Sequence, residues 1–272
     1  MKPASFAFHS VRDVKGALEV MGRSGAKPSA GNQSLGPMLN LRLARPSALV
    51  DVATLPQLRG VNERGHSVRY GAGITHAEFE DGDVPDATPG WLRAAAGRIA
   101  HRAVRNRGTV GGSLAHADPA ADWVIVMTGL FAEVILTSRG GERRMPVAEF
   151  IKGPFQTALK ADEIILAVEV PRPGLDGRWG YWKFVRQVGE FAKASAVVLA
   201  DPATRRYRCA LGALGGRPIV LAEPEAIIAG SVTPAAAVAQ ALPDRAAHER
   251  ALHVAALTHA LEAASTEPPA QA

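Results

Sequence analysis

Hydrophobic and polar positions alternate along the first half of the chain in patterns that predict one clear helix and several strands. Between residues 11 and 21, Val11, Val14, Leu18 and Met21 recur every three or four positions, as on one face of an amphipathic helix. Short apolar runs bounded by glycine, proline or polar residues predict buried strands. These runs are residues 48–52, 67–74, 132–138 and 165–171.

The same pattern predicts the organisation of the second half. Strong helix formers fill residues 91–106, which predicts one continuous helix. Pro171, Pro173 and Gly174 interrupt the pattern and mark a domain boundary. Two apolar runs, 194–201 and 207–214, predict paired strands across a short turn. Alanine-rich helices are expected at 235–242 and 248–264, followed by a disordered tail at 266–272.

Composition narrows the class of protein. The 272 residues are 47% hydrophobic and 21% charged, which is ordinary for a globular protein of two or three compact units. The net charge of +5 comes from arginines spread along the chain, a pattern that does not suggest a nucleic-acid groove. We expect neither a secretory signal nor a membrane span, because no apolar run is long enough.

The single cysteine, Cys209, excludes an intramolecular disulfide and any cluster held by several thiolates of this chain. A reducing, cytoplasmic location fits this composition. No set of histidines has the spacing of a metal site, and no G-x-S-x-G elbow is present for nucleophilic catalysis. We therefore expect no metal and no catalytic side chain on this chain, so the chemistry must belong to a cofactor.

Two glycine runs are candidates for binding phosphate. Residues 31–37 have the glycine spacing of a P-loop, but Pro37 stands where lysine is required. Residues 71–76 begin like a dinucleotide fingerprint, but His76 replaces the third glycine. We reject both motifs.

Consecutive backbone amides can still form nests for phosphate oxygens. Residues 111–113 offer one nest, with the hydroxyls of Thr109 and Ser113 as further donors. Residues 31–34 offer a second, in which Asn32 tolerates a left-handed conformation. Two nests would suit a pyrophosphate gripped from two sides. The alternative is that both runs are tight turns between core elements.

Three segments, AGNQSLGPMLNLRLARPSALVDV (30–52), IAHRAVRNRGTVGGSLAHADPAADW (99–123) and GPFQTALKADEIILAVEVP (153–171), carry a family resemblance. They resemble, in order, the FAD-binding medium subunit of the molybdenum hydroxylases, the carbon monoxide dehydrogenase and xanthine dehydrogenase family. LGALGGRPIVLAEPEAIIAG (211–230) resembles the start of that family's C-terminal flavoprotein domain.

The resemblance implies an α+β fold. An FAD-binding domain of the vanillyl-alcohol-oxidase (PCMH) type would span 1–173, with subdomains of about 1–54 and 55–173. A C-terminal α+β domain of the carbon monoxide dehydrogenase flavoprotein type would span 174–265.

The resemblance also implies a set of FAD contacts. Residues 30–34 and 109–113 would be the two pyrophosphate loops, Asp122 would lie at the adenosine ribose and Ile165 against the flavin ring. Lys183 would lie near the isoalloxazine, with Arg186 as the alternative. The implied contacts are Ala30, Gly31, Asn32, Gln33, Ser34, Leu35, Thr109, Val110, Gly111, Gly112, Ser113, Asp118, Asp122, Ile165 and Lys183.

Finally, the resemblance implies partners. Gln33 stands where covalent flavoproteins have histidine, so FAD is expected to bind noncovalently. A small subunit would hold [2Fe-2S] clusters and a large one the molybdenum cofactor, in a dimer of heterotrimers that passes electrons to NAD, oxygen or a quinone. Two alternatives stay open: a self-contained flavin oxidoreductase with its own substrate pocket, and an assembly subunit that has lost FAD.

Overall fold

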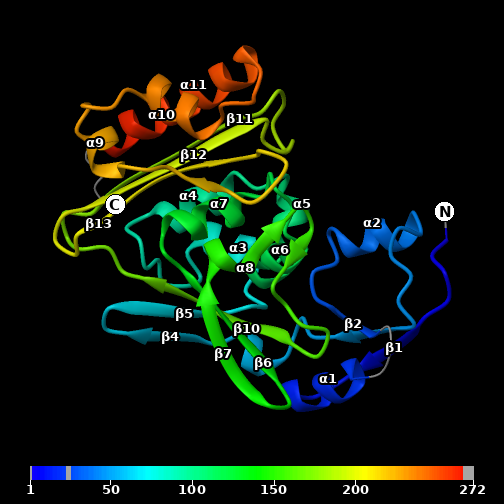
Figure 1. Cartoon of the computed structure of the whole chain (residues 1–272). Coiled ribbons are helices and arrows are strands. Elements are labelled where there is room, and N and C mark those ends of the chain that lie inside the picture. Colours follow the sequence, from blue (N-terminus) through cyan, green and yellow to red (C-terminus); the bar gives the residue numbers. More distant parts are fainter. Residues whose placement is uncertain (1, 23–25, 266–272) are drawn as a thin grey trace.

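The computed structural model describes residues 2–22 and 26–265, and Figure 1 shows three main sheets with helices packed between and over them. The predicted tail at 266–272 lies outside the described residues. The predicted α+β class is confirmed, since helices and strands are both abundant and each sheet is paired with helices. Among the described residues, no helix is long and apolar enough to cross a membrane.

The first sheet is small and parallel. Its strands lie in the order β1 (Ala7–Ser10), β3 (Ala48–Asp51) and β2 (Ala26–Ser29), and its helices are α1 (Val14–Met21) and α2 (Leu35–Asn40). The buried strand predicted at 48–52 is confirmed as the central strand. The predicted first helix is confirmed but starts three residues late, because the Asp13 carboxylate caps it by accepting a hydrogen bond from Gly16 N at 2.7 Å.

The second sheet is antiparallel and has five strands, in the order β4-β5-β10-β6-β7. It confirms the strands predicted at 67–74, 132–138 and 165–171. One face packs on the core through residues such as Tyr70, Val134 and Val168, all fully buried. The strands are β4 (Val61–Arg64), β5 (Ser67–Gly71), β6 (Glu133–Ser138), β7 (Gly141–Pro146) and β10 (Ile164–Pro171).

Short elements surround this sheet. Helices α3 (His76–Asp81), α4 (Trp91–Gly97), α5 (Arg102–Arg105), α6 (Val110–His116) and α7 (Asp122–Gly129) lie between β5 and β6 in the chain. The remaining elements are the 3-10 turn η1 (Pro56–Leu58), helix α8 (Val147–Phe150) and the strand pair β8 (Ile151–Gly153) and β9 (Gln156–Thr157).

The continuous helix predicted over 91–106 is wrong. The chain forms α4 and α5, separated by a turn in which Ala100 takes a φ of +43°. Arg105 stabilises this turn by donating hydrogen bonds to the carbonyls of Ile99 and Ala100 at 3.0 and 3.1 Å. Side-chain bonds of this kind override helix propensity, which is a weak preference per residue.

The third sheet is antiparallel, in the order β11 (Arg178–Phe184), β12 (Ala194–Asp201), β13 (Arg206–Gly212) and β14 (Ile219–Val220). The strand pair predicted around the turn at 202–205 is confirmed as β12 and β13. Helices α9 (Pro224–Ile228), α10 (Pro234–Ala241) and α11 (Ala247–Ser265) cover its outer face (Figure 1). They confirm the two helices predicted at 235–242 and 248–264.

Helix α7 lies between the second and third sheets. Every residue of α7 is buried, and the helix packs against β12 and β13. At its C-terminal end, Arg208 of β13 donates to the Thr128 carbonyl at 2.9 Å, and its guanidinium lies 3.5 Å from the ring centroid of Phe131. A cation suits the negative end of a helix dipole, so this contact fixes α7 to the third sheet.

Candidate functional site

One cleft of about 560 Å³ opens between the first sheet, the helices beside the second sheet and a loop before β12. That volume is within the range of ligand sites, roughly 300 to 1,000 Å³. All of the predicted FAD contacts line this cleft except Val110, which is fully buried in the core, and Lys183. The fold therefore brings together residues that are distant in sequence and were expected to share a site. Their contact with FAD stays a prediction.

The first predicted loop is held rigid by its own side chains. Asn32 has a φ of +59°, so the expected left-handed conformation is confirmed. Its amide donates to Ser29 Oγ at 2.8 Å and to the Ala30 carbonyl at 3.2 Å, and the Gln33 amide donates to the Gly31 carbonyl at 3.0 Å. The loop therefore keeps its shape through local bonds as it enters α2.

The second predicted loop is not the tight turn that the sequence left open as the alternative. Gly111 and Gly112 form the first turn of α6, whose N-cap is Thr109; Thr109 Oγ1 accepts a hydrogen bond from Gly112 N at 3.0 Å. Glycine is needed here for close packing, since a Cβ on Gly111 would lie 2.4 Å from Ala72 Cβ. The amides of this first turn are already bonded, since Val110 N donates to the Ile74 carbonyl, Gly111 N to the Ala72 carbonyl and Gly112 N to Thr109 Oγ1. What this segment offers an anion is therefore the hydroxyls of Thr109 and Ser113.

Gly31 is the residue of the first loop that lies against the chain leading into the second loop. A Cβ on Gly31 would lie 1.8 Å from the Arg107 carbonyl oxygen and 2.9 Å from Gly108 N. The backbone before α2 therefore touches the backbone before α6 at a position where only glycine fits. The two predicted loops form one continuous wall of the cleft.

Asp122 connects the cleft to the third sheet. Its carboxylate lines the cleft, pairs with Lys183 Nζ at 2.6 Å and accepts a hydrogen bond from the Tyr181 hydroxyl. Lys183 also donates to the Arg98 carbonyl at 2.8 Å, so it lies behind Asp122. Burial, followed by the nearby Asp122 charge, raises the pKa of Tyr181 well above its usual value, so the phenol stays protonated. Arg186, the alternative to Lys183, is exposed and paired with Glu190.

His76 is a neutral histidine in the cleft wall. Trp123 Nε1 donates to His76 Nδ1 at 2.8 Å, which places the imidazole proton on Nε2. Burial, with the nearby Arg105 charge, lowers the pKa of His76 to about 3. The His76 backbone N–H donates to the Gly108 carbonyl at 2.9 Å, so this residue supports the second loop.

Replacing His76 with glutamine is expected to remove part of the acid sensitivity of the fold. The unfolded chain protonates His76 below about pH 6.5 whereas the folded chain does not until about pH 3, so stability falls as pH drops through this range. The expected wild-type loss from this group between pH 7 and pH 5 is about 2 kcal/mol. Urea unfolding at several pH values measures it.

His248→Gln is the control for this change, because His248 is exposed at the start of α11. It should keep the wild-type dependence of stability on pH. An unchanged dependence in His76→Gln would contradict a neutral, buried His76.

The sequence did not reveal several apolar residues of the cleft. Ile99 was hidden inside the helix predicted over 91–106. Phe191 lies on the loop before β12, which is distant in sequence from either glycine run. Phe155 lies within a segment that carried the family resemblance; it has a φ of +56° and packs against the His116 ring at 5.1 Å between centroids. Such left-handed backbone at a bulky residue is a signal that appears only in the structure.

The chemistry of the lining fits FAD. The backbone amides of residues 31–34 and the hydroxyls of Thr109 and Ser113 suit a pyrophosphate. The Asp122 carboxylate suits ribose hydroxyls, and aliphatic residues such as Ile165 suit a flat ring system. No group of metal-ligating side chains was found among residues 2–22 and 26–265.

Comparison with known proteins identifies a matching family and close relatives. Residues 4–173 match the family described as the FAD binding domain in molybdopterin dehydrogenase. The chain is 37% identical over 238 residues to the nicotine 6-hydroxylase medium subunit of Paenarthrobacter nicotinovorans, across 85% of this chain and 82% of that protein. It is 34% identical over 201 residues to the carbon monoxide dehydrogenase medium chain of Hydrogenophaga pseudoflava, across 73% and 70%.

Solved structures agree over nearly the whole chain. Carbon monoxide dehydrogenase from Hydrogenophaga pseudoflava superposes with a TM-score of 0.87 at 30% identity, covering 97% of this chain and 98% of that one. Quinoline 2-oxidoreductase from Pseudomonas putida 86 gives a TM-score of 0.85 at 30% identity with the same coverage. The similarity therefore extends beyond residues 4–173 to the third sheet.

Proposed function

The chain belongs to the FAD-binding medium subunits of the molybdenum hydroxylase family, and we propose that it carries electrons from the [2Fe-2S] clusters of a partner subunit to an external acceptor. Bound FAD would supply the conversion between one-electron and two-electron transfer. The observation that supports this role best is the meeting of the two glycine segments at Gly31, which builds a single wall of amides and hydroxyls.

We propose that the residues of this chain bind and orient the cofactor rather than take part in the chemistry. The segments at 30–35 and 109–113 would hold the pyrophosphate, and Asp122, with Asp118 nearby, would hold the adenosine ribose. Ile165 would pack on the flavin ring. Lys183, placed behind Asp122, would fix that carboxylate. We assign residues 1–173 to the FAD-binding domain and 174–265 to the C-terminal domain.

We propose that the substrate is selected by another subunit. Relatives of this chain are named for nicotine, carbon monoxide, glyceraldehyde and caffeine, which share little chemistry. Cys209, the only cysteine, is buried, so iron–sulfur clusters must be held by partner chains. The proposed assembly is a cytoplasmic dimer of heterotrimers with a small iron–sulfur subunit and a large molybdenum subunit.

The visible absorption spectrum of the purified chain tests the cofactor. We expect the two bands of an oxidised flavin, and we expect denaturation to release FAD into the supernatant because the attachment is noncovalent. A colourless chain that takes up no added FAD would contradict the proposal.

Co-purification from the native cell tests the electron-transfer role. Iron, molybdenum and two further chains should accompany the tagged protein. A chain that arrives alone and oxidises a small molecule by itself would favour a self-contained oxidoreductase.

A further inference from the structure

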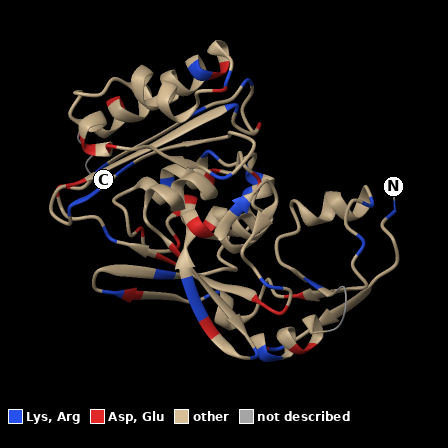
Figure 2. Cartoon of the chain, in the orientation of Figure 1, with Lys and Arg blue, Asp and Glu red and all other residues tan. Residues whose placement is uncertain are grey.

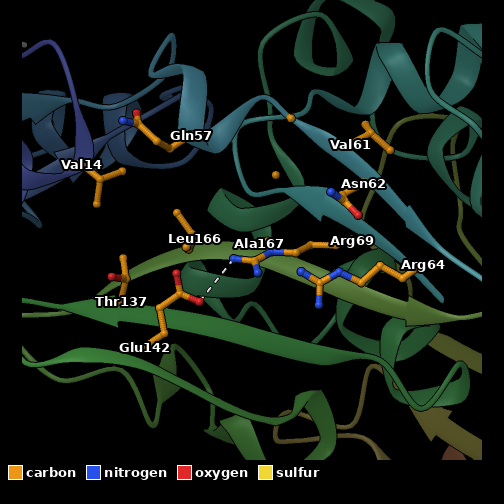
Figure 3. Close-up of a pocket in the computed structure, with 12 residues that line it drawn as sticks. Val14, Gln57, Val61, Asn62, Arg64, Arg69, Thr137, Glu142, Leu166 and Ala167 are labelled. Carbon is orange, nitrogen blue, oxygen red and sulfur yellow. Dashed lines mark hydrogen bonds and ion pairs between the residues drawn. The ribbon is translucent and has the colours of Figure 1, made fainter.

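A second hollow of about 440 Å³ lies over the five-stranded sheet, on the face that carries Arg69 (Figure 3). The neighbour of Arg69 on β5, Tyr70, points to the opposite, buried face. We call the hollow the Arg64–Arg69 groove. It runs across the sheet from β4 to β7, with η1 and α1 at one end. None of the residues proposed to contact FAD lines it, and only Ile165 on β10 is next in the chain to a lining residue, Leu166, so the groove is a separate feature of the molecule.

Two arginines share one face of this groove. In the β4–β5 pairing, Arg69 is opposite Asn62 and Arg64 is opposite Ser67, so the two arginines are diagonal neighbours on the same face of the sheet. Diagonal neighbours in such a pair are roughly 7 to 8 Å apart, within reach of long side chains. Figure 3 shows both guanidinium groups extending into the hollow.

Protein carboxylates compensate these two charges poorly. The Arg69 side chain is 20% exposed, and its one ion pair is a long contact of 3.5 Å with Glu142, which is 52% exposed. Arg64 has no hydrogen bond or ion pair within the part of the chain that the structure describes. A guanidinium presents a fork of donors that matches a carboxylate or a phosphate, and a bound oxyanion would reduce the repulsion between the two cations.

The rest of the groove suits the body of a small molecule. The amides of Asn62 and Gln57 and the hydroxyl of Thr137 can form directional hydrogen bonds. Val14 and Leu166 provide apolar surface at the other end of the hollow. Charge at one end and apolar surface at the other are the features of a site for a small organic anion.

The groove and the cleft share their walls. Three residues that line the groove are each next in the chain to a residue that lines the cleft. Gln57, Gly71 and Leu166 line the groove, whereas Leu58, Ala72 and Ile165 line the cleft. These walls are tightly packed, because a Cβ on Gly71 would lie 2.3 Å from the Leu58 carbonyl oxygen. A shift on one side of such a wall is transmitted to the other, since packed interiors are hard to compress.

We propose that the Arg64–Arg69 groove binds a small organic anion, through a carboxylate or phosphate held by the two arginines, and that its occupancy changes the environment of the cofactor cleft behind it. The site is separate from the proposed electron-transfer role. Binding can be tested on the chain without FAD, so failure of one proposal does not decide the other.

An NMR titration of the chain with benzoate, with inorganic phosphate and with neutral benzamide tests the site. We expect benzoate or phosphate to shift the backbone amides of Gly71 and Leu166 with a dissociation constant of roughly 0.1 to 10 mM, and benzamide to bind at least about tenfold more weakly. The double variant Arg64→Ala/Arg69→Ala should lose at least about tenfold in affinity. Arg178→Ala, on an exposed arginine of β11, should bind as the wild type does.

Visible circular dichroism of the FAD-loaded chain tests the link between the two hollows. Adding the anion should change the flavin signal in the wild type and in Arg178→Ala but not in the double variant. An unchanged flavin signal in the wild type at saturating anion would contradict the proposed link between the groove and the cleft. Equal affinity in the double variant, or no binding of either anion to the wild type, would overturn the site itself.

Discussion

Gly31→Ala is expected to weaken FAD binding by about 100-fold or more, the largest loss from any single methyl group in the cleft. The new Cβ would lie 1.8 Å from the Arg107 carbonyl oxygen, a backbone atom that cannot move without displacing Gly108 and the start of α6. The two segments would separate, and the amides of the first and the hydroxyls of the second would no longer face one pyrophosphate. Titration of the apoprotein with FAD, followed by quenching of flavin fluorescence, measures the loss.

Gly36→Ala is the matched control. Gly36 lies in α2, five residues further on, and a Cβ there would meet only Asn32 Cβ at 3.8 Å. Alanine in a helix is favoured over glycine by about 0.5 to 1 kcal/mol, so this variant should bind FAD normally and be no less stable. Normal FAD affinity in Gly31→Ala would show that the two segments do not act as one wall.

Asp122→Ala is expected to lower the free energy of unfolding by about 3 to 5 kcal/mol and to weaken FAD binding. The change leaves the Lys183 ammonium, whose side chain is only 8% exposed, without its carboxylate, and it leaves the Tyr181 hydroxyl without its acceptor. Chemical unfolding of the apoprotein measures the stability, and FAD titration measures the affinity.

A second substitution separates the two effects of this change. In Asp122→Ala/Lys183→Met the uncompensated charge is gone, and replacing both members of a buried pair by apolar groups is often close to neutral for stability. Most of the lost stability should return, while FAD affinity stays low because the ribose contact is still missing. Recovery of affinity together with stability would show that Asp122 acts only through the fold.

The local parts of the fold were predictable because their signals are local. Residues 48–52 and 165–171 became β3 and β10 as their β-branched runs indicate. The break at Ala100 was missed because the bonds from the Arg105 side chain to the Ile99 and Ala100 carbonyls leave no trace in a pattern of helix formers. Gly97, which disfavours a helix interior, was the one local signal of it. Gly111 and Gly112 were predicted to form an amide nest, with a tight turn as the alternative, yet both are helical, and Gly111 serves to admit Ala72.

The cleft was predicted as a set of residues but not as a geometry. The family resemblance suggested Asp122 and Lys183 as two separate contacts with FAD, whereas the structure pairs them with each other. Tyr181 carries no motif and is recognisable only from its bond to Asp122. The Arg64–Arg69 groove is assembled from seven elements, so no spacing in the sequence could have revealed it. Figure 2 shows basic residues on all three sheets rather than gathered on one segment.

Burial of α7 on every side has a consequence for synthesis of the chain. A helix with no polar face must be enclosed, and part of the enclosure of α7 is formed by β12 and β13. Those strands follow α7 by about 80 residues in the chain, which at ordinary translation rates of about 5 to 20 residues per second is a delay of roughly 4 to 16 seconds. On the ribosome, this apolar helix therefore lacks one side of its enclosure until β12 and β13 have been synthesised.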